Sequence, residues 1–466
     1  MAGSFSSINT ALTALRYQQV ALDVASTNVA NVGTDGYVRR RVVGETLGAA
    51  SSPAVWSRSH ETSSGVQATR VDRMTDTLLD SRVRREHSRQ TYLDARTEAL
   101  ARVETGLAEP GPAGVAAALS DLRATLNDLG NAPGSDAARS QALSAAATVV
   151  DTVRLQAAHL SDEASDQRAH LLASVVEANS VATELAATNR TIAAALGGGS
   201  DTTTLMDERD ALALRLAELT GARGTVRDDG SMYVELGGQP LVDGSAAAQL
   251  VVTGGVGADG SATGGPVSFA LDPDTTGATT ALTSALGGDL GATVDVLDDA
   301  LPSYIAGLSA VAKDLADHVN AQHQLGYDAN GVAGGKLFDY DPADVLGTFG
   351  VVITDASQLA VSALPGGVRD GNNATALAAA VDVDDQYQRL VNGFGSTVAS
   401  ARQMAANQQA LTDQVDSARE QLTGVSLDEE TVNMISAQRA YEAAARVMTT
   451  LDSVLDTLIN RTGLVR

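Results

Sequence analysis

Cysteine is absent from the 466 residues, so disulfide bonds and thiolate metal ligands are excluded. Phenylalanine, tryptophan and tyrosine together make up only 3% of the chain, which leaves alanine, leucine and valine to form the core. Alanine and leucine favour helices. The scarcity of both residue classes therefore indicates a mainly α-helical protein without covalent cross-links.

Positive charge is also scarce, because 32 Lys and Arg face 57 Asp and Glu, and the net charge is −25. Residues 1–110 contain 13 Arg and 12 acidic side chains, a net charge of +1, so the rest of the chain carries −26. Proteins that bind nucleic acids gain much of their affinity by neutralising phosphates. The acidic balance therefore argues against a nucleic-acid partner.

Long apolar runs are missing, since no stretch approaches the ~20 apolar residues that a membrane span requires. Residues 1–7 contain no basic side chain and are not followed by an apolar stretch, so we expect no secretory signal peptide. Composition alone would predict a cytoplasmic protein that is not inserted in a membrane.

Patterns that carry chemistry are missing as well. No two of the six histidines are four residues apart, which makes a helical zinc site improbable. Residues 331–336 lack the glycine spacing of a phosphate loop. We interpret the charge cluster of residues 207–210 as a solvated helix face with an internal ion pair. The sequence thus predicts no enzyme, no cofactor and no metal site.

What the sequence does contain is an unbroken heptad pattern at each end. Apolar residues recur at alternating steps of three and four near the C-terminus, at Met434, Ala437, Tyr441, Ala444, Met448, Leu451, Leu455 and Leu458. The same steps occur near the N-terminus, interrupted only by the polar Gln18, at Ile8, Ala11, Leu15, Leu22, Ala25, Val29 and Val32. Each stripe requires a second helix to cover it. The two helices either dock separately on the core or pair with each other.

Between these ends the sequence alternates between helical and glycine-rich stretches. Helical patterns occupy residues 72–108, 115–129, 136–196, 202–220, 301–325 and 374–421. A helix of ~60 residues is far longer than the ~11 of an average globular helix, so the stretch 136–196 indicates a rod-like bundle. Residues 221–300 hold 16 of the 44 glycines and several short β patterns, which predict a small inserted β domain.

The predicted fold is mainly α, with paired terminal helices forming a coiled coil, a long rod-like bundle and the β domain at its tip. We divide the chain into five segments. Residues 1–70 form an N-terminal helix, an extended segment over 38–47 and an irregular hairpin or loop over 48–70, in which Trp56 is either a buried anchor or a contact residue. Residues 71–220 and 301–423 are the two halves of the rod, 221–300 the β domain, and 424–466 the C-terminal helix.

Short motifs at both ends resemble those of the bacterial flagellar axial proteins, the family of rod, hook and hook-associated subunits. These motifs are NVAN at 28–31, TDGY at 34–37, GVSLDEE at 424–430, QRAY at 438–441 and LDTLI at 455–459. Interior motifs resemble the hook-associated members, among them LMDERD at 205–210, DDGS at 228–231, GYDANG at 326–331 and DGNNA at 370–374. Asp35 departs from the family, which usually has proline there, and residues 240–300 match little.

The resemblance implies a structural subunit that polymerises between hook and filament and connects them. It implies as partners the hook protein, hook-associated protein 3, further copies of the chain in a helical layer, and a cytoplasmic export chaperone of the FlgN kind. It also implies export by the flagellar type III route to an extracellular location at the hook–filament junction. The expected assembly interface comprises Ile8, Leu15, Leu22, Val29, Met434, Tyr441, Met448, Leu451, Leu455 and Leu458.

Two alternatives remain open at the level of sequence. The first is a flagellar hook or rod subunit, which the long helix at 136–196 disfavours because such proteins are mostly β between their ends. The second, more distant alternative is a flagellar axial protein that carries an enzyme in its β domain, for which we find no catalytic motif.

Overall fold

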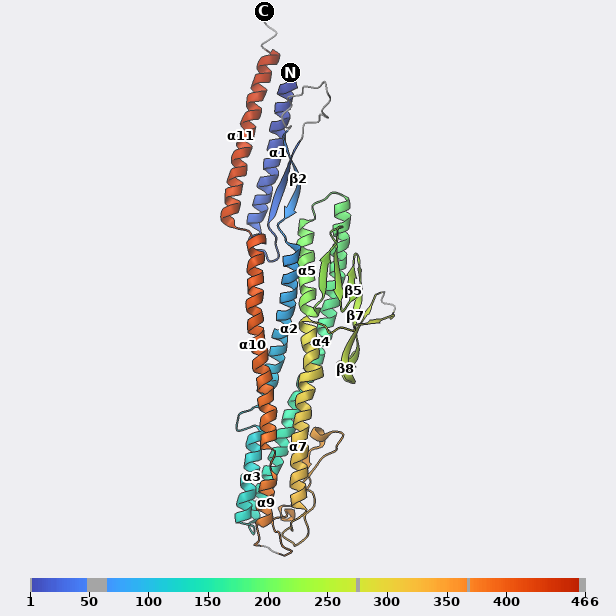
Figure 1. The fold of residues 1–466 in the computed structure, drawn as a ribbon, viewed down its shortest axis with the longest axis vertical. Helices are drawn as coiled ribbons and strands as arrows, with labels where there is room; N and C mark the ends of the chain where they lie inside the picture. Colours follow the sequence, from blue (N-terminus) through green and yellow to red (C-terminus); the bar gives the residue numbers. More distant parts are fainter. Residues whose placement is uncertain (1, 48–64, 274–276, 367–368, 461–466) are drawn as a thin grey trace, which may run out of the picture.

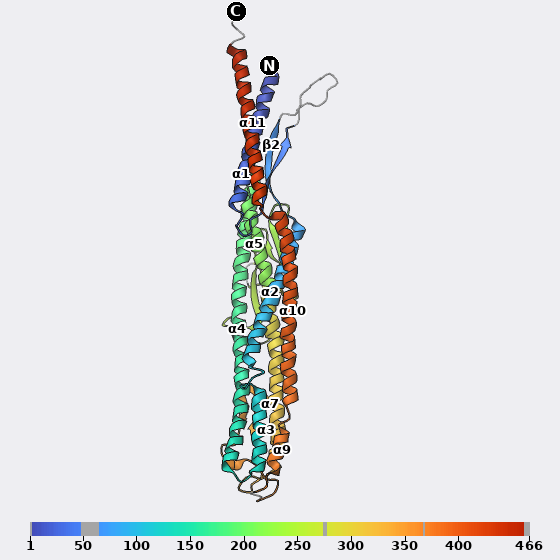
Figure 2. The same cartoon turned by 90° about the vertical axis from the view of Figure 1, so that its left-hand side faces the viewer.

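A computed structural model describes residues 2–47, 65–273, 277–366 and 369–460, with side chains from residue 7 to residue 457. The chain forms an elongated body in which long helices run along one axis, and both termini lie at the same end (Figures 1 and 2). Within the described residues, no helix is both long enough and apolar enough to cross a membrane.

Helices make up most of the described chain and follow the sequence prediction closely. Their bounds are α1 Ala2–Ala30, α2 Thr77–Leu107, α3 Val115–Asn131, α4 Asp136–Gly197, α5 Thr203–Thr220, α6 Gly288–Asp295, α7 Leu301–His323, α8 Val345–Thr348, α9 Asn372–Ala380, α10 Asp384–Thr423 and α11 Leu427–Asn460. A π-helical turn, Val296–Ala300, joins α6 to α7 and makes 288–323 one helical stretch.

The rod is built around α4, whose 62 residues confirm the predicted long helix. Ser135 caps its start by accepting a hydrogen bond from the backbone N–H of Ala138, and the glycines after residue 196 end it. Buried alanines, valines and leucines of α2, α3, α4, α7, α9 and α10 form the main core. Tyr304 and Tyr387 are two of its few buried aromatic side chains. Small core residues let these helices approach closely.

The inserted β segment forms two antiparallel sheets, but it does not lie at the tip of the rod. One sheet has the order β3-β4-β5-β6 and the other β7-β8-β9. Their bounds are β3 Arg223–Val226, β4 Met232–Leu236, β5 Gln239–Asp243, β6 Ala246–Ala247, β7 Gln249–Val256, β8 Ala262–Asp272 and β9 Thr280–Ala281. Both sheets pack along the flank of α4 and α5 (Figure 1).

The predicted tip position was wrong because both ends of the β segment join the rod at one point. Gly221, which ends α5, lies against Gly287, which precedes α6, and the N–H of Gly287 donates to the carbonyl of Thr220 over 3.0 Å. A second core then joins strand residues such as Met232 and Phe269 to α4 residues such as Leu185. The β structure also ends earlier than residue 300, since α6 begins at Gly288.

The far end of the rod, opposite the termini, consists of loops between α7 and α9 (Figure 1). They contain the short strands β10 Phe338–Asp339 and β11 Gly350–Val351 and a 3-10 turn, Ala356–Gln358. The single helix predicted over 374–421 is two helices, because the chain breaks at residues 381–383. Arg123 of α3 holds this break by bonding the carbonyl of Val381 and the carboxylate of Asp384.

Near the termini, β1 Arg40–Thr46 pairs antiparallel with β2 Val66–Arg73. The extended segment predicted over 38–47 is therefore a strand, and the last residues of the hairpin or loop predicted over 48–70 belong to its antiparallel partner. The strand β2 delays the start of α2 from the expected residue 72 to Thr77, where Asp76 caps the helix. Trp56 lies outside the described residues.

Candidate assembly surface

The terminal helices α1 and α11 lie side by side and antiparallel, away from the rod (Figures 1 and 2). Three of the four heptad alanines, Ala11, Ala25 and Ala437, are buried, and the fourth, Ala444, is half-buried. The larger predicted interface residues are half-buried, namely Ile8, Leu15, Leu22, Val29, Met434, Met448, Leu451 and Leu455. Tyr441 is 40% exposed, and the side chain of Leu458 lies outside the described residues. A two-helix contact thus covers each stripe only in part.

A second apolar face of α11 is exposed to solvent. Val432 is 66% exposed and Val447 51%, and Ile435 and Val454 are also exposed. On the N-terminal side, α1 ends at Ala30, so Val32 lies in a turn and is not part of the helical stripe as predicted. At this end of the helix the carbonyl of Thr27 accepts hydrogen bonds from both the backbone N–H and the side-chain amide of Asn31. Exposed apolar stripes such as this one on α11 are typical of interaction surfaces.

A polar cluster fixes the position where α1 meets the start of α11. Asn28 is buried, and its amide nitrogen donates to the Arg40 carbonyl at 2.9 Å and to Glu430 Oε2 at 3.0 Å. Its amide oxygen accepts from the Tyr37 hydroxyl at 2.8 Å and from the Arg40 N–H at 3.0 Å. Burial raises the pKa of the Tyr37 hydroxyl, although the Arg40 guanidinium opposes the rise.

Arg39 completes this cluster by binding the acidic first turn of α11. Its guanidinium contacts Glu430 at 2.7 Å and Glu429 at 2.8 Å, and its N–H donates to the carbonyl of Thr423 at the end of α10. Glu430 is buried, so its charge requires such a partner. We call this cluster the latch; it comprises Asn28, Tyr37, Arg39, Arg40, Glu429 and Glu430. The terminal motifs contained Asn28, Tyr37, Glu429 and Glu430 but neither Arg39 nor Arg40, and no spacing or pattern indicated the role of these residues.

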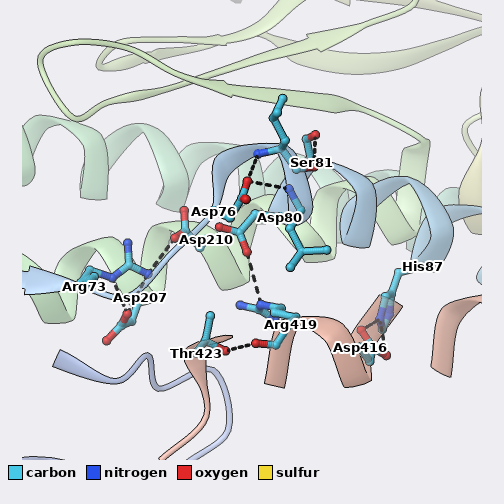
Figure 3. A network of polar contacts seen from close by, with 12 residues as sticks. Arg73, Asp76, Asp80, Ser81, His87, Asp207, Asp210, Asp416, Arg419 and Thr423 are labelled. Carbon is cyan, nitrogen blue, oxygen red and sulfur yellow. Dashed lines mark hydrogen bonds and ion pairs between the residues drawn. The ribbon is translucent and has the colours of Figure 1, made fainter. Parts of the chain in front are cut away.

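A second ionic cluster joins the terminal part of the chain to the rod. Asp207 of α5 binds Arg40 at 3.2 Å and Arg73 at 2.8 Å, and Arg73 also binds Asp210 at 2.8 Å. Asp210 in turn pairs with the buried Arg209 at 2.7 Å. We call Arg40, Arg73, Asp207, Arg209 and Asp210 the seat; Figure 3 shows Arg73 reaching Asp207 and Asp210. The internal ion pair was predicted correctly, but the interpretation of a solvated face was wrong.

Burial governs the electrostatics of the seat. It raises the pKa of Asp207, and the guanidinium groups of Arg73 and Arg40 oppose this without cancelling it. Burial also raises the pKa of the nearby Asp80, which forms an ion pair with Arg419 of α10 at 3.3 Å (Figure 3). A cleft of about 960 Å³ lies beside the seat and is lined by β2, α2, α5 and β3. Within the described residues, no group of His, Asp and Glu could hold a metal ion.

Further along the rod, His87 of α2 links two other helices. It lies 3.4 Å from Glu218 of α5 and 3.0 Å from Asp416 of α10, the latter visible in Figure 3. The hydrogen bond to Glu218 raises the pKa of His87, burial lowers it, and the bond to Asp416 raises it further, with a net rise. The hydrogen bond from His87 lowers the pKa of Glu218 in return.

Paired terminal helices on an elongated helical rod define the subunit of an axial assembly, and the two ends match family models of flagellar axial proteins. The model described as flagella basal body rod protein matches residues 8–37, and that of the flagellar basal body rod FlgEFG protein C-terminal region matches 421–461. The FlgK helical domain of the flagellar hook-associated protein matches 100–338, just over half of the chain. The chain belongs to the FlgK family of hook-associated proteins, the structural proteins of the hook–filament junction.

Relatives of known name support this over the full length of the chain. It is 28% identical to flagellar hook-associated protein 1 of Bacillus subtilis, with 99% of each chain covered. It is 25% identical to the protein of the same name from Escherichia coli, covering 97% of this chain and 99% of that one. The flagellar hook junction protein FlgK of Burkholderia pseudomallei has a similar fold, with a TM-score of 0.64 and 17% identity over 73% of this chain and 99% of the other. The match over 100–338 favours a hook-associated protein over the rod or hook subunit.

Proposed function

We propose that α1 and α11 form the surface through which this junction protein assembles, as a coiled coil whose outer faces meet the terminal helices of neighbouring subunits. The observation that supports this proposal is that the contact between α1 and α11 buries each heptad stripe only in part. Leu15, Leu451 and Leu455 stay half-buried in the single chain, and Val432 and Val447 lie exposed beside them. Fully burying a side chain such as leucine stabilises an assembly by about 1.5–3 kcal/mol.

The five segments of the chain would occupy different positions in the assembly. The terminal unit, residues 1–70 and 424–466, would line the axis of the assembly, and the rod halves, 71–220 and 301–423, would stand outside it. The predicted β segment of 221–300 would lie on the outer flank, because its sheets pack on only one side of α4 and α5. Since residues 221 and 287 adjoin, we place the boundary of the inserted unit at 221–287.

The proposed partners follow from this position. One layer of the protein would bind the hook protein on one side and hook-associated protein 3 on the other, outside the cell at the hook–filament junction. Before export by the flagellar type III route, a FlgN-like chaperone would cover the stripe of α11. The exposed Val432, Ile435, Val447 and Val454 support this, because such a face would otherwise favour premature association.

Substitution of Leu455 by aspartate tests the assembly surface. The buried charge would prevent the seam from forming, whereas the rod would stay folded because Leu455 belongs to neither core. We expect cells with Leu455→Asp to build hooks without filaments and to shed flagellin, as deletion of the gene would. Asp452→Asn, at an exposed position of α11, is the control. A motile Leu455→Asp strain with normal filaments would contradict the proposal.

A further inference from the structure

Three arginines on the first half of α2 form a basic stripe on an acidic protein. Arg82, Arg85 and Arg89 follow one another at three and four residues and so share one helix face with Leu78. Leu78 is 79% exposed, and all three arginines are exposed. Arg85 and Arg89 form no ion pair or hydrogen bond with any residue that the structure describes. The Arg82 guanidinium lies 4.0 Å from Glu86, which already accepts from Gln408.

The other arginines of α2 differ, because each has a partner within the chain, which for the exposed Arg102 is Glu163. Arg84 is buried and donates to the carbonyl of Gly224 over 3.3 Å, and Arg96 pairs with Asp295. Like charges one helical turn apart destabilise a helix slightly. Apart from the 4.0 Å contact of Arg82 with Glu86, the stripe therefore has no stabilising role within the described chain, and the exposed Leu78 adds apolar surface beside it.

The complementary surface lies on an exposed face of α4, where Asp162 and Asp166 border a hollow that they share with Arg102 of α2. Asp151, Leu155, Asp162 and Asp166 are spaced by four, seven and four residues and so share one face, which continues to Val176. Leu155 is 59% exposed and Val176 69%. In the described part of the chain, these three carboxylates have no hydrogen-bond or ion-pair partner. The face thus offers the opposite charge and a matching apolar component.

The two faces cannot meet within one chain. The ion pair of Arg102 with Glu163 places residue 102 of α2 level with residue 163 of α4. Arg85 is 17 residues before Arg102, which corresponds to about 25 Å along the helix axis. Asp162 therefore lies about 25 Å further from the termini than Arg85. A contact between them has to join two copies with an axial stagger.

The geometry points to a lateral contact in which the Arg82–Arg85–Arg89 stripe of one subunit binds the Asp151–Asp162–Asp166 face of the next. This inference rests on the proposed self-association and names the surfaces that the rods use. Because the two surfaces differ, the contact is heterologous, and with an axial stagger it builds a helical layer instead of a closed dimer. Leu78 and Leu155 contribute apolar area beside the ion pairs.

Cross-linking tests the contact directly, because the natural chain has no cysteine. Cells would carry Arg85→Cys together with Asp162→Cys, and hook particles would be isolated and oxidised. We expect a ladder of disulfide-linked copies. Arg389→Cys with Asp162→Cys is the control, since Arg389 is an exposed arginine of α10 outside the stripe. An equal ladder in the control, or a cross-link to hook protein or a chaperone instead, would overturn the inference.

A charge swap tests it independently. Arg85→Glu with Arg89→Glu should lower the amount of the protein retained in hook particles about tenfold, because the new carboxylates would repel the aspartates across the contact. Adding Asp162→Arg and Asp166→Arg should restore it, and Arg389→Glu should change nothing. Circular dichroism of each purified variant verifies its fold. Unchanged retention of the double glutamate variant, or a loss that the aspartate-to-arginine changes do not restore, would refute the lateral contact alone. Absence of the wild-type protein from the particles would refute the proposed function.

Discussion

Asn28 uses all the hydrogen-bonding capacity of its amide group in the latch, where it joins Tyr37, Arg40 and Glu430. The sequence suggested only that this residue belongs to a terminal motif. Its main partner, Glu430, is 402 positions away, and no local pattern relates two polar residues at that distance. The apolar residues of the stripe were predictable because their spacing repeats, whereas a buried polar contact occurs once.

Replacing Asn28 by alanine should open the terminal pair locally. The buried Glu430 carboxylate and the half-buried Tyr37 hydroxyl would lose this partner, which costs about 2 kcal/mol, or about thirty-fold in the opening equilibrium. Hydrogen exchange at the start of α11 should accelerate by that factor, while exchange in α4 stays unchanged. Asn9→Ala, at an exposed position of α1, is the control. Equal exchange in the two variants would show that the latch does not hold the pair.

His87 should make stability depend on pH. Its raised pKa means that its contribution is complete below the ordinary value of 6.5 and is lost as pH rises through the folded-state pKa. The lowered pKa of Glu218 means that its contribution is complete above the ordinary value of 4.5 and is lost as pH falls through its folded-state pKa. The pair therefore stabilises the rod most between those two values.

The matching variant is His87→Gln, which keeps a polar side chain without a titrating group. Between about pH 6 and pH 9 the natural protein should lose about 1 kcal/mol more of its free energy of unfolding than the variant does. Urea denaturation at each pH measures the difference. Parallel pH profiles for the two proteins would mean that the charged His87 contributes nothing to stability.

Among the secondary-structure elements, α4 was predicted within one residue at its end, whereas the placement of the β segment failed. The helix α4 has local signals at both ends, with Pro133 and Ser135 before it and a glycine run after it. The strands were found from short β patterns, but their packing depends on where the segment leaves and rejoins the rod. That junction consists of Gly221 against Gly287, a contact without a sequence pattern.

Gly221→Ala should test how the β segment is attached. Gly221 has a φ of +77°, and a Cβ there would lie 2.7 Å from the backbone of Gly287. Both strain and overlap oppose the substitution, so we expect a loss of about 3 kcal/mol in the free energy of unfolding. Gly238 has a φ of +83°, but a Cβ added there would meet no heavy atom within 4 Å, so Gly238→Ala should lose only about 1 kcal/mol. Equal losses would show that the close approach is unimportant.

On the scale of the whole molecule, the terminal unit and the rod are two bodies that no shared apolar core joins. The two apolar cores lie in the rod and the β segment, and neither includes a described residue of α1 or α11. The terminal unit is instead joined to the rod by the residues between β2 and α2, by those between α10 and α11, and by the ionic seat. Heptad patterns predicted the terminal pair and the length of the helix over 136–196 predicted the rod, but the connection depends on arginines and aspartates whose pairing follows only from the fold.

This connection predicts that the seat sets the angle between the two bodies. With Asp207→Asn, Arg40 and Arg73 lose their shared carboxylate, and the cleft of about 960 Å³ beside them leaves room for the terminal unit to tilt. Spin labels on Ser436→Cys of α11 and Ser400→Cys of α10, both exposed, report the distance between the bodies. We expect a broader distance distribution for Asp207→Asn than for the control Glu208→Gln, whose exposed side chain lies on the same helix. If the distance distribution of Asp207→Asn is as narrow as that of the protein with an intact seat, the two connecting segments alone fix the angle.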